Sequence, residues 1–322
     1  LALMLLLLLT TFIMLFIIYS FSLYSKNMYN TKDKMLSLEL IKGLVILSIF
    51  SLLNSFIIPL NINYEIFILL FAFVNFIYFK GWRNSELYLN KRPLYLLFFS
   101  LLTLFVGSMN AYIYDTFSYY IPTIKWLDDY GLVKGLGNFD FNFGQSSLWH
   151  ILQASFNETI DPFYKLNVLL VFVYLIYINE IKEYKYYIFL PIFYLFIASP
   201  SPDLAIFILS IIIILNYLKN KNTEAIKFGL IISVVLVLIK PISFVLPLFF
   251  LYLYCKNCKV FDLKFISIIG FLTLLFICKN ILLTGNITFP LSYGNLTFLD
   301  FSIPQEIYEI SAKDGRYLST SR

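Results

Sequence analysis

The sequence predicts an all-α, polytopic membrane protein. Of its 322 residues, 60% are hydrophobic and only 13% are charged, and the mean hydropathy is +0.81. A soluble domain carries about 25% charged residues, so this chain lacks the polar side chains to cover a surface that faces water. These values exclude a soluble globular domain and a disordered chain, and three cysteines are too few for a secreted disulfide scaffold.

Apolar runs recur along the chain, and a membrane-spanning helix needs about 20 mostly apolar residues. We therefore expect about ten transmembrane helices, together with interfacial helices in one long outer loop. The expected spans lie at roughly 1–24, 36–60, 64–79, 94–109, 162–178, 186–198, 203–218, 226–239, 241–254 and 265–283. The first run has no basic segment before it and no small-residue cleavage site, so it is interpreted as a span and not as a signal peptide.

The basic residues predict the orientation of the spans. Most lysines and arginines fall in every second loop, and such loops face the cytoplasm in membrane proteins. The basic loops are 25–35, 80–93, 179–185, 219–227 and 255–264. In the long loop on the opposite side, 110–161, the carboxylates outnumber the two lysines, which fits an outward position.

This pattern divides the chain into four parts. They are N-terminal transmembrane helices in 1–109, the outer loop in 110–161, cavity-lining transmembrane helices in 162–283, and an outer C-terminal tail in 284–322. The chain starts with Leu1 and stops in a polar segment, so we expect a sequence that is truncated at its C-terminus.

Three of the expected spans, 186–198, 226–239 and 241–254, are too short to cross a bilayer alone. Short helices at membrane depth must be covered by protein or line a water-filled cavity. Their outward turns would then lie below the membrane surface, one in the run Ser199-Pro-Ser-Pro-Asp203 and one at Lys240-Pro241. The sequence therefore predicts a cavity that opens outward.

Charged side chains inside or just under the membrane are costly, so they are candidates for function. Asp115, Asp203, Lys240 and Lys279 all fall at outward ends of expected spans, where they could converge on one cavity. Asp115 is a candidate general base or metal ligand, or otherwise a helix N-cap. Lys240 is a candidate for binding a phosphate, or otherwise a snorkelling lysine. Asp203 could cap a helix and Lys279 could anchor one, or each could belong to the site.

The residues after Asp115 have the pattern of an interfacial helix. Phe117, Tyr120, Ile121, Ile124 and Leu127 recur at three- and four-residue spacing. Residue type adds three candidates for contact with substrate. Tyr119 and Tyr120 have aromatic rings suited to a sugar, and His150 is the only histidine. No cofactor is indicated with certainty, although a divalent metal is compatible with the acidic residues. No basic-aromatic stripe indicates nucleic acid.

Several stretches resemble the GT-C class of membrane glycosyltransferases, which includes protein mannosyltransferase-like enzymes, and more closely a bacterial family of multi-span proteins placed near that class. The matching stretches are Asp115-Thr-Phe-Ser-Tyr-Tyr120, Tyr130-Gly-Leu-Val-Lys-Gly-Leu-Gly-Asn138, Ser146-Ser-Leu-Trp149, Ser199-Pro-Ser-Pro-Asp203, Ile239-Lys240, Lys279-Asn280, Phe289-Pro290 and Ile303-Pro304. They cover most of the chain from about 110 onward.

The resemblance implies transfer of a sugar from a polyprenyl-phosphate carrier to an outward-facing glycan or lipid acceptor, in the bacterial inner (cytoplasmic) membrane. It places the catalytic carboxylate at Asp115. Two alternatives remain open: an O-antigen-type polysaccharide polymerase or ligase, whose outer loops are usually basic and rich in Arg, and a transporter, for which internal repeats and mid-membrane charges would be expected.

Overall fold

The computed structural model describes residues 2–24, 35–82, 93–257 and 262–311. In this part of the chain the fold is all-helical, without strands, and its only bridge pairs Asn286 with Asn295. The all-α prediction is therefore confirmed.

Each of the ten predicted apolar runs overlaps a helix. The longer helices are α1 (Ala2–Ser22), α2 (Leu36–Ser55), α3 (Ile62–Tyr78), α5 (Pro93–Gly107), α8 (Leu166–Ile181), α10 (Pro202–Asn220), α11 (Thr223–Ile239), α12 (Val245–Asn257) and α13 (Leu263–Thr284). The shorter elements are η2 (Thr116–Tyr120), α6 (Ile121–Tyr130), η3 (Leu136–Asn138), η4 (Phe141–Gln145), α7 (Leu148–Ala154), η5 (Tyr184–Phe189), α9 (Leu190–Tyr194), η6 (Pro241–Phe244) and η7 (Ser292–Gly294).

Four of the described helices, α1, α2, α10 and α13, are long and apolar enough to cross a membrane. Four shorter apolar helices accompany them, Ile62–Tyr78, Leu94–Gly107, Leu166–Ile181 and Pro241–Asn257. Apolar side chains on the outside of the molecule, such as those of Leu70, Phe98 and Leu274, are exposed. A surface of this kind is typical of a membrane protein, because lipid is the solvent that it suits.

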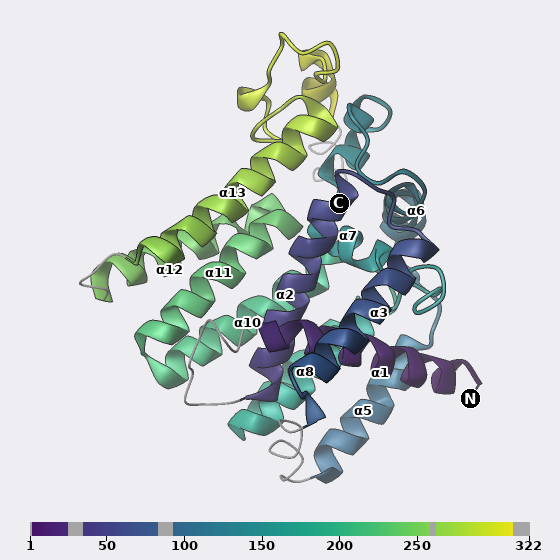
Figure 1. The fold of residues 1–322 in the computed structure, drawn as a ribbon, viewed down its shortest axis with the longest axis vertical. Coiled ribbons are helices and arrows are strands. Elements are labelled where there is room, and N and C mark those ends of the chain that lie inside the picture. The colour runs from purple at the N-terminus through teal and green to yellow at the C-terminus, as the bar shows by residue number, and fades with distance from the viewer. Residues whose placement is uncertain (1, 25–34, 83–92, 258–261, 312–322) are drawn as a thin grey trace.

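Helix α8 lies at the centre of the fold. Most of its side chains are buried, and it packs against α1, α2, α5 and α10 (Figure 1). A helix that is apolar on all sides is expected to be enclosed by other helices. The polar residue Asn167, near the N-terminus of α8, is also buried.

Helices α11 and α12 form the hairpin that the Lys240-Pro241 junction predicts. α11 ends at Ile239, η6 makes the turn, and α12 returns along α11. The close approach is visible at Gly229, where an added Cβ would lie 2.2 Å from the ring of Phe250. The glycine therefore allows the two helices to pack tightly.

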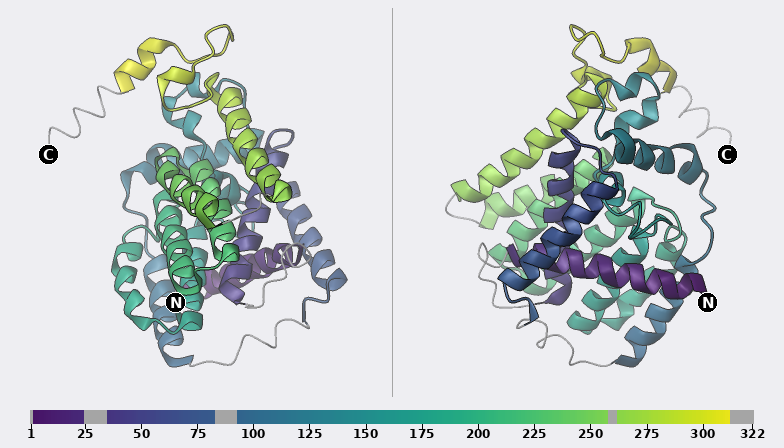
Figure 2. Two further views of the ribbon diagram at one scale, coloured as in Figure 1. Left: turned by 90° about the vertical axis from the view of Figure 1, so that its left-hand side faces the viewer. Right: turned by 45° about the vertical axis from the view of Figure 1, so that its right-hand side comes forward.

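The outer-loop helices and the segment after α13 gather at the same end of the molecule (upper part of Figure 1, and both views of Figure 2). The backbone N–H of Gly135 donates to the carbonyl of Leu282 (2.8 Å), and the side chain of Asn138 donates to the carbonyl of Phe301. Lys134 and Asp300 add a surface ion pair of 3.4 Å. These contacts bind the loop to the end of α13.

The helix after Asp115 differs from the regular pattern expected for it. Residues 116–120 form a π-helical turn, and the backbone N–H of Ile121 accordingly donates to the carbonyl of Thr116. Tyr120, Ile124 and Leu127 are buried as expected, whereas Phe117 is exposed. A π-helical turn holds more residues than an α-turn and shifts the buried face, which a pattern of period 3.6 cannot anticipate.

Candidate active site

The run Ser199-Pro-Ser-Pro-Asp203 forms the turn that begins α10. Ser201 is the N-cap, its Oγ accepts from the backbone N–H of Asp203 (3.3 Å), and Pro202 occupies the first helical position. The alternative in which Asp203 caps this helix is therefore wrong, because a serine two residues earlier fills that role. This leaves the Asp203 carboxylate available for another partner.

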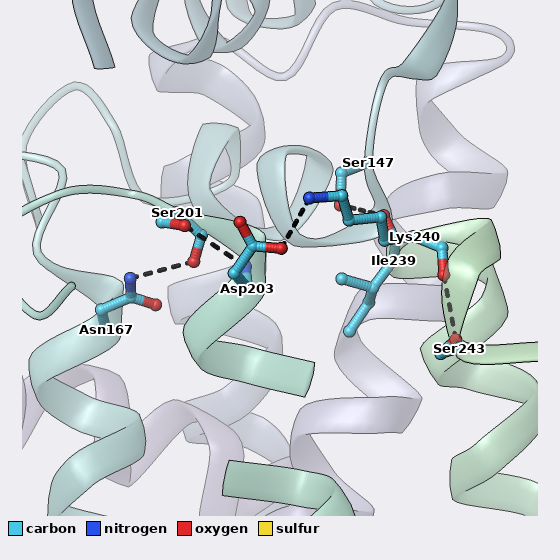
Figure 3. Close-up of polar contacts among 7 residues, drawn as sticks. All are labelled: Ser147, Asn167, Ser201, Asp203, Ile239, Lys240 and Ser243. Atoms are coloured by element: carbon cyan, nitrogen blue, oxygen red, sulfur yellow. Dashed lines mark hydrogen bonds and ion pairs between the residues drawn. The ribbon is translucent and has the colours of Figure 1, made fainter. Parts of the chain in front are cut away.

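That partner is Lys240, at the end of α11. The residue before a proline avoids helical backbone angles, and Lys240 is accordingly extended, with φ −154° and ψ 123°. Its Nζ donates to Oδ1 of Asp203 at 2.6 Å (Figure 3). Each side chain is 32% exposed, so the ion pair lies at the edge of the protein interior and not in its core.

Hydrogen bonds fix the backbone on the Asp203 side of the ion pair. The amide of Asn167 donates to the carbonyls of Ser199 (2.6 Å) and Ser201 (3.0 Å), and its oxygen accepts from Nε1 of Trp149 (2.9 Å). One buried side chain thus joins α7 and α8 to the start of α10. The sequence analysis missed Asn167, although a polar residue inside an apolar run is a signal that could have found it.

A buried lysine, Lys165, contacts the backbone directly before the turn that begins at Ser199. Nζ of Lys165 donates to the carbonyls of Met109 and Ala198, both at 2.9 Å. The backbone N–H of Lys165 donates to Oδ2 of Asp161, which also accepts from Gln153. Because its donors are spent on carbonyl groups, we interpret Lys165 as a structural cation that holds the end of α5 to the turn.

The Lys240 side is fixed in a similar way. Oγ of Ser147 donates to the carbonyl of Ile239 (2.7 Å), and Oγ of Ser243 donates to the carbonyl of Lys240 (2.9 Å; Figure 3). The sequence analysis missed both serines because their partners lie far along the chain or on the backbone. The backbone on either side of the ion pair is therefore anchored, and the long Lys240 side chain is its most adjustable part.

A small pocket lies beside Lys240. It is lined by Tyr119, Asn142, Gln145, Ser146, Ser147, His150, Pro202, Ile239, Lys240 and Pro241. Its volume of about 10 Å³ is the space of one water molecule. Three of these residues, Tyr119, His150 and Lys240, were candidates from the sequence. The other polar side chains that line the pocket come from segments distant in sequence.

His150 is buried against the rings of Tyr119 and Tyr120, with ring centroids 6.5 and 5.0 Å away. Burial, followed by the charge of Lys279, lowers the pKa of His150 to about 3, although a hydrogen bond with the Pro200 backbone opposes the shift. The imidazole is therefore neutral at physiological pH. Its Nε2 atom is buried without a hydrogen-bond partner among the described residues.

Asp115 precedes the same tyrosines in the sequence and is not among the residues that line the pocket. It is half-buried and makes no capping hydrogen bond, so the N-cap alternative does not hold for its side chain. Burial is the main cause that raises the pKa of Tyr119 and of Tyr120, and the charges of Asp115 and Asp203 contribute to both shifts. Both carboxylates therefore act electrostatically on the same tyrosine pair, and Oγ1 of Thr116 and Oγ of Ser199 join their two segments at 2.7 Å.

Lys279 lies behind the pocket wall. It is 3% exposed, and its Nζ is within hydrogen-bond distance of the carbonyls of Ser146 (2.9 Å) and Gln145 (3.3 Å). Of the two alternatives for this residue, these contacts favour anchoring, because the ammonium holds the pocket-lining turn to α13.

Across the described ranges, no three histidine, cysteine or acidic side chains are grouped so that they could hold a metal ion. We accordingly assign no residues to a metal.

The fold and the site define an all-helical protein with membrane-compatible helices and a small pocket beside the start of α10 and the end of α11. Residues 4–321 match the family described as Domain of unknown function (DUF8201), and the chain belongs to this family. No curated protein and no solved structure matches the chain.

Proposed function

We propose that this protein is a membrane glycosyltransferase that moves a sugar from a polyprenyl-phosphate carrier to an outward-facing glycan or lipid acceptor. The observation that carries the proposal is that Tyr119, His150 and Lys240 line one small pocket, and that Asp203 pairs with Lys240 beside it. A transferase of this kind needs a cation for the phosphate, a carboxylate for the acceptor, and hydrogen-bonding groups for the sugar.

The proposal includes ten membrane spans, a bacterial inner-membrane location and a pocket that faces away from the cytoplasm. The overlap of the ten apolar runs with helices supports the number of spans. The acidic outer loop supports the orientation, because Lys and Arg concentrate in loops on the cytoplasmic side. The acidic loop also favours this function over an O-antigen-type polymerase or ligase.

Lys240 is the residue that would hold the phosphate. Transfer breaks the bond between the anomeric carbon and the phosphate oxygen, and the electron pair stays on that oxygen. A fixed ammonium stabilises the growing negative charge at this position. Lys240 is suited to the role because it lines the pocket and is part-exposed, whereas the buried Lys279 is committed to backbone carbonyls.

Asp115 is the residue that would accept the proton of the acceptor hydroxyl as the acceptor oxygen bonds to the anomeric carbon. Its half-buried carboxylate and the phenols of Tyr119 and Tyr120 provide polar groups for an acceptor to contact. Neutral His150 would hydrogen-bond a sugar hydroxyl through Nε2, the nitrogen that lacks a partner. The pocket must widen to admit a sugar, since it now has room for one water.

The test compares the surface glycan of the native host with wild-type protein, Asp115→Asn and Lys240→Met. Both variants are expected to remove the added sugar, while the exposed Asp129→Asn and Lys134→Met serve as matched controls that retain it. Unchanged glycan in Asp115→Asn would remove the base assignment. Unchanged glycan in every variant and in a deletion strain would reject the transferase function.

A further inference from the structure

The donor phosphate would need the ammonium of Lys240, and in the structure this ammonium is already paired with the carboxylate of Asp203. Asp203 holds the ammonium of Lys240 at 2.6 Å, and this is the only hydrogen bond of that Nζ among the described residues. A phosphate that binds Lys240 must therefore either share the ammonium with a carboxylate or replace it. Sharing would put two anions side by side, which is unfavourable.

Replacement requires only side-chain movement. The backbone of Asp203 is fixed through Ser201 and through Asn167, and that of Lys240 is fixed through Ser243. The lysine has a flexible four-carbon stem that can turn its ammonium toward the pocket. Both side chains are about one-third exposed, and part-exposed ion pairs are weak, so the singly charged phosphodiester of the donor can compete for the ammonium.

We propose that Asp203 is an exchangeable counter-ion: the phosphate of the donor takes its place on Lys240, and the released carboxylate stays at the pocket edge, where it accepts a hydrogen bond from a sugar hydroxyl. This inference rests on the proposed function. It assigns Asp203 a task that follows donor binding.

The counter-ion role and a positioning role make opposite predictions. If Asp203 competes with phosphate, the fraction of protein with a free Lys240 limits the apparent affinity, and Asp203→Asn raises that fraction. If Asp203 only positions Lys240, its loss weakens phosphate binding. A simple affinity measurement therefore separates the two roles.

The experiment measures binding of undecaprenyl phosphate to the full chain in lipid nanodiscs, with inorganic phosphate and phosphatidylglycerol as separate probes. Asp203→Asn is expected to tighten binding of undecaprenyl phosphate by roughly threefold to tenfold. Asp203→Ser also removes the charge, should give the same gain, and replaces Asp203→Asn if that variant fails to fold. Asp203→Glu, which can keep the ion pair, is the control and should bind as the wild type does. The double variant Asp203→Asn/Lys240→Met should bind as weakly as Lys240→Met alone.

Comparison of the probes identifies the source of the phosphate. A gain with undecaprenyl phosphate that is absent with phosphatidylglycerol supports exchange with a polyprenyl phosphate. An equal gain with phosphatidylglycerol would show that any phospholipid replaces the carboxylate and would overturn the assignment to the donor. Equal or weaker binding by Asp203→Asn would overturn the inference. The affinity readout does not depend on transfer: a protein that transfers no sugar but shows the expected gain would reject the proposed function and keep the exchange.

Discussion

Asp203 and Lys240 are 37 positions apart in the sequence, and their side chains meet at 2.6 Å. Asp203 lies in the first turn of α10 and Lys240 follows the last residue of α11, so the pair joins neighbouring ends of two antiparallel helices. One helix start and one helix end thereby place a carboxylate and an ammonium beside the same pocket.

Asn167 is expected to be essential for the geometry of the site. Asn167→Val removes the donor to the carbonyls of Ser199 and Ser201 and the acceptor for Trp149. An unpaired buried polar group costs about 1–3 kcal/mol, so the melting temperature in detergent should fall by several degrees. Asn142→Val, at an exposed position, is the control and should melt as the wild type does. An unchanged melting temperature for Asn167→Val would contradict the role assigned to this amide.

Gly131 is expected to tolerate no side chain. Its φ is +71°, and an added Cβ would lie 2.7 Å from the carbonyl oxygen of Ser55 and 2.8 Å from that of Ile58. Such a backbone conformation costs roughly 1–3 kcal/mol for other residues, to which the clash adds. Thermal unfolding should show a clear loss for Gly131→Ala and no loss for Gly270→Ala, where an added Cβ meets nothing within 4 Å. Similar behaviour of both variants would be inconsistent with a strained turn after α6.

The carboxyl group of Asp128 is expected to make the stability of the protein depend on pH. Burial, together with a hydrogen bond and repulsion from Glu158, raises its pKa from 3.8 to about 7. The folded state therefore holds this proton more tightly than the unfolded state. Asp128 accordingly favours folding at low pH, and this contribution is lost as the pH rises through about 7.

The measurement is the melting temperature between about pH 5 and pH 8, a range that includes the shifted pKa of Asp128. Asp128→Asn should flatten the profile and raise stability mainly at the upper end, where the wild type carries the buried charge. Asp129→Asn, at the exposed neighbouring position, should keep the wild-type slope. A slope that survives in Asp128→Asn would show that another group causes it.

The sequence predicted much of the fold because helix formation in this chain follows local hydropathy. The apolar runs and the break at Lys240-Pro241 both correspond to features of the structure. The correct cap of α10 was missed because Ser201 and Asp203 are both good cap residues, and only the hydrogen bond distinguishes them. The π-helical turn at 116–120 was missed because it interrupts the periodicity on which the prediction relied.

The candidate site was predicted less completely, for a different physical reason. Charge in an apolar environment identified Asp203, Lys240 and Lys279, since such groups stand out in any sequence of this kind. Lys240 pairs with the carboxylate of Asp203, and Lys279 donates to two backbone carbonyls. These partners are distant in the sequence, so no local pattern indicates them. Lys165 was missed although it is a buried lysine, because it sits at the start of an apolar run, where a lysine could also reach water.

The central claim is that the ammonium of Lys240 binds the phosphate of a lipid carrier, and direct binding of undecaprenyl phosphate tests it best. Titration of the full chain in nanodiscs should give saturable binding by wild type and by Lys134→Met, a charge-matched control on the outer surface. Lys240→Met should weaken binding by about tenfold or more, as expected when a charge-assisted contact worth about 1.5–3 kcal/mol is lost. Equal affinity of Lys240→Met and wild type, with both folded, would contradict the account.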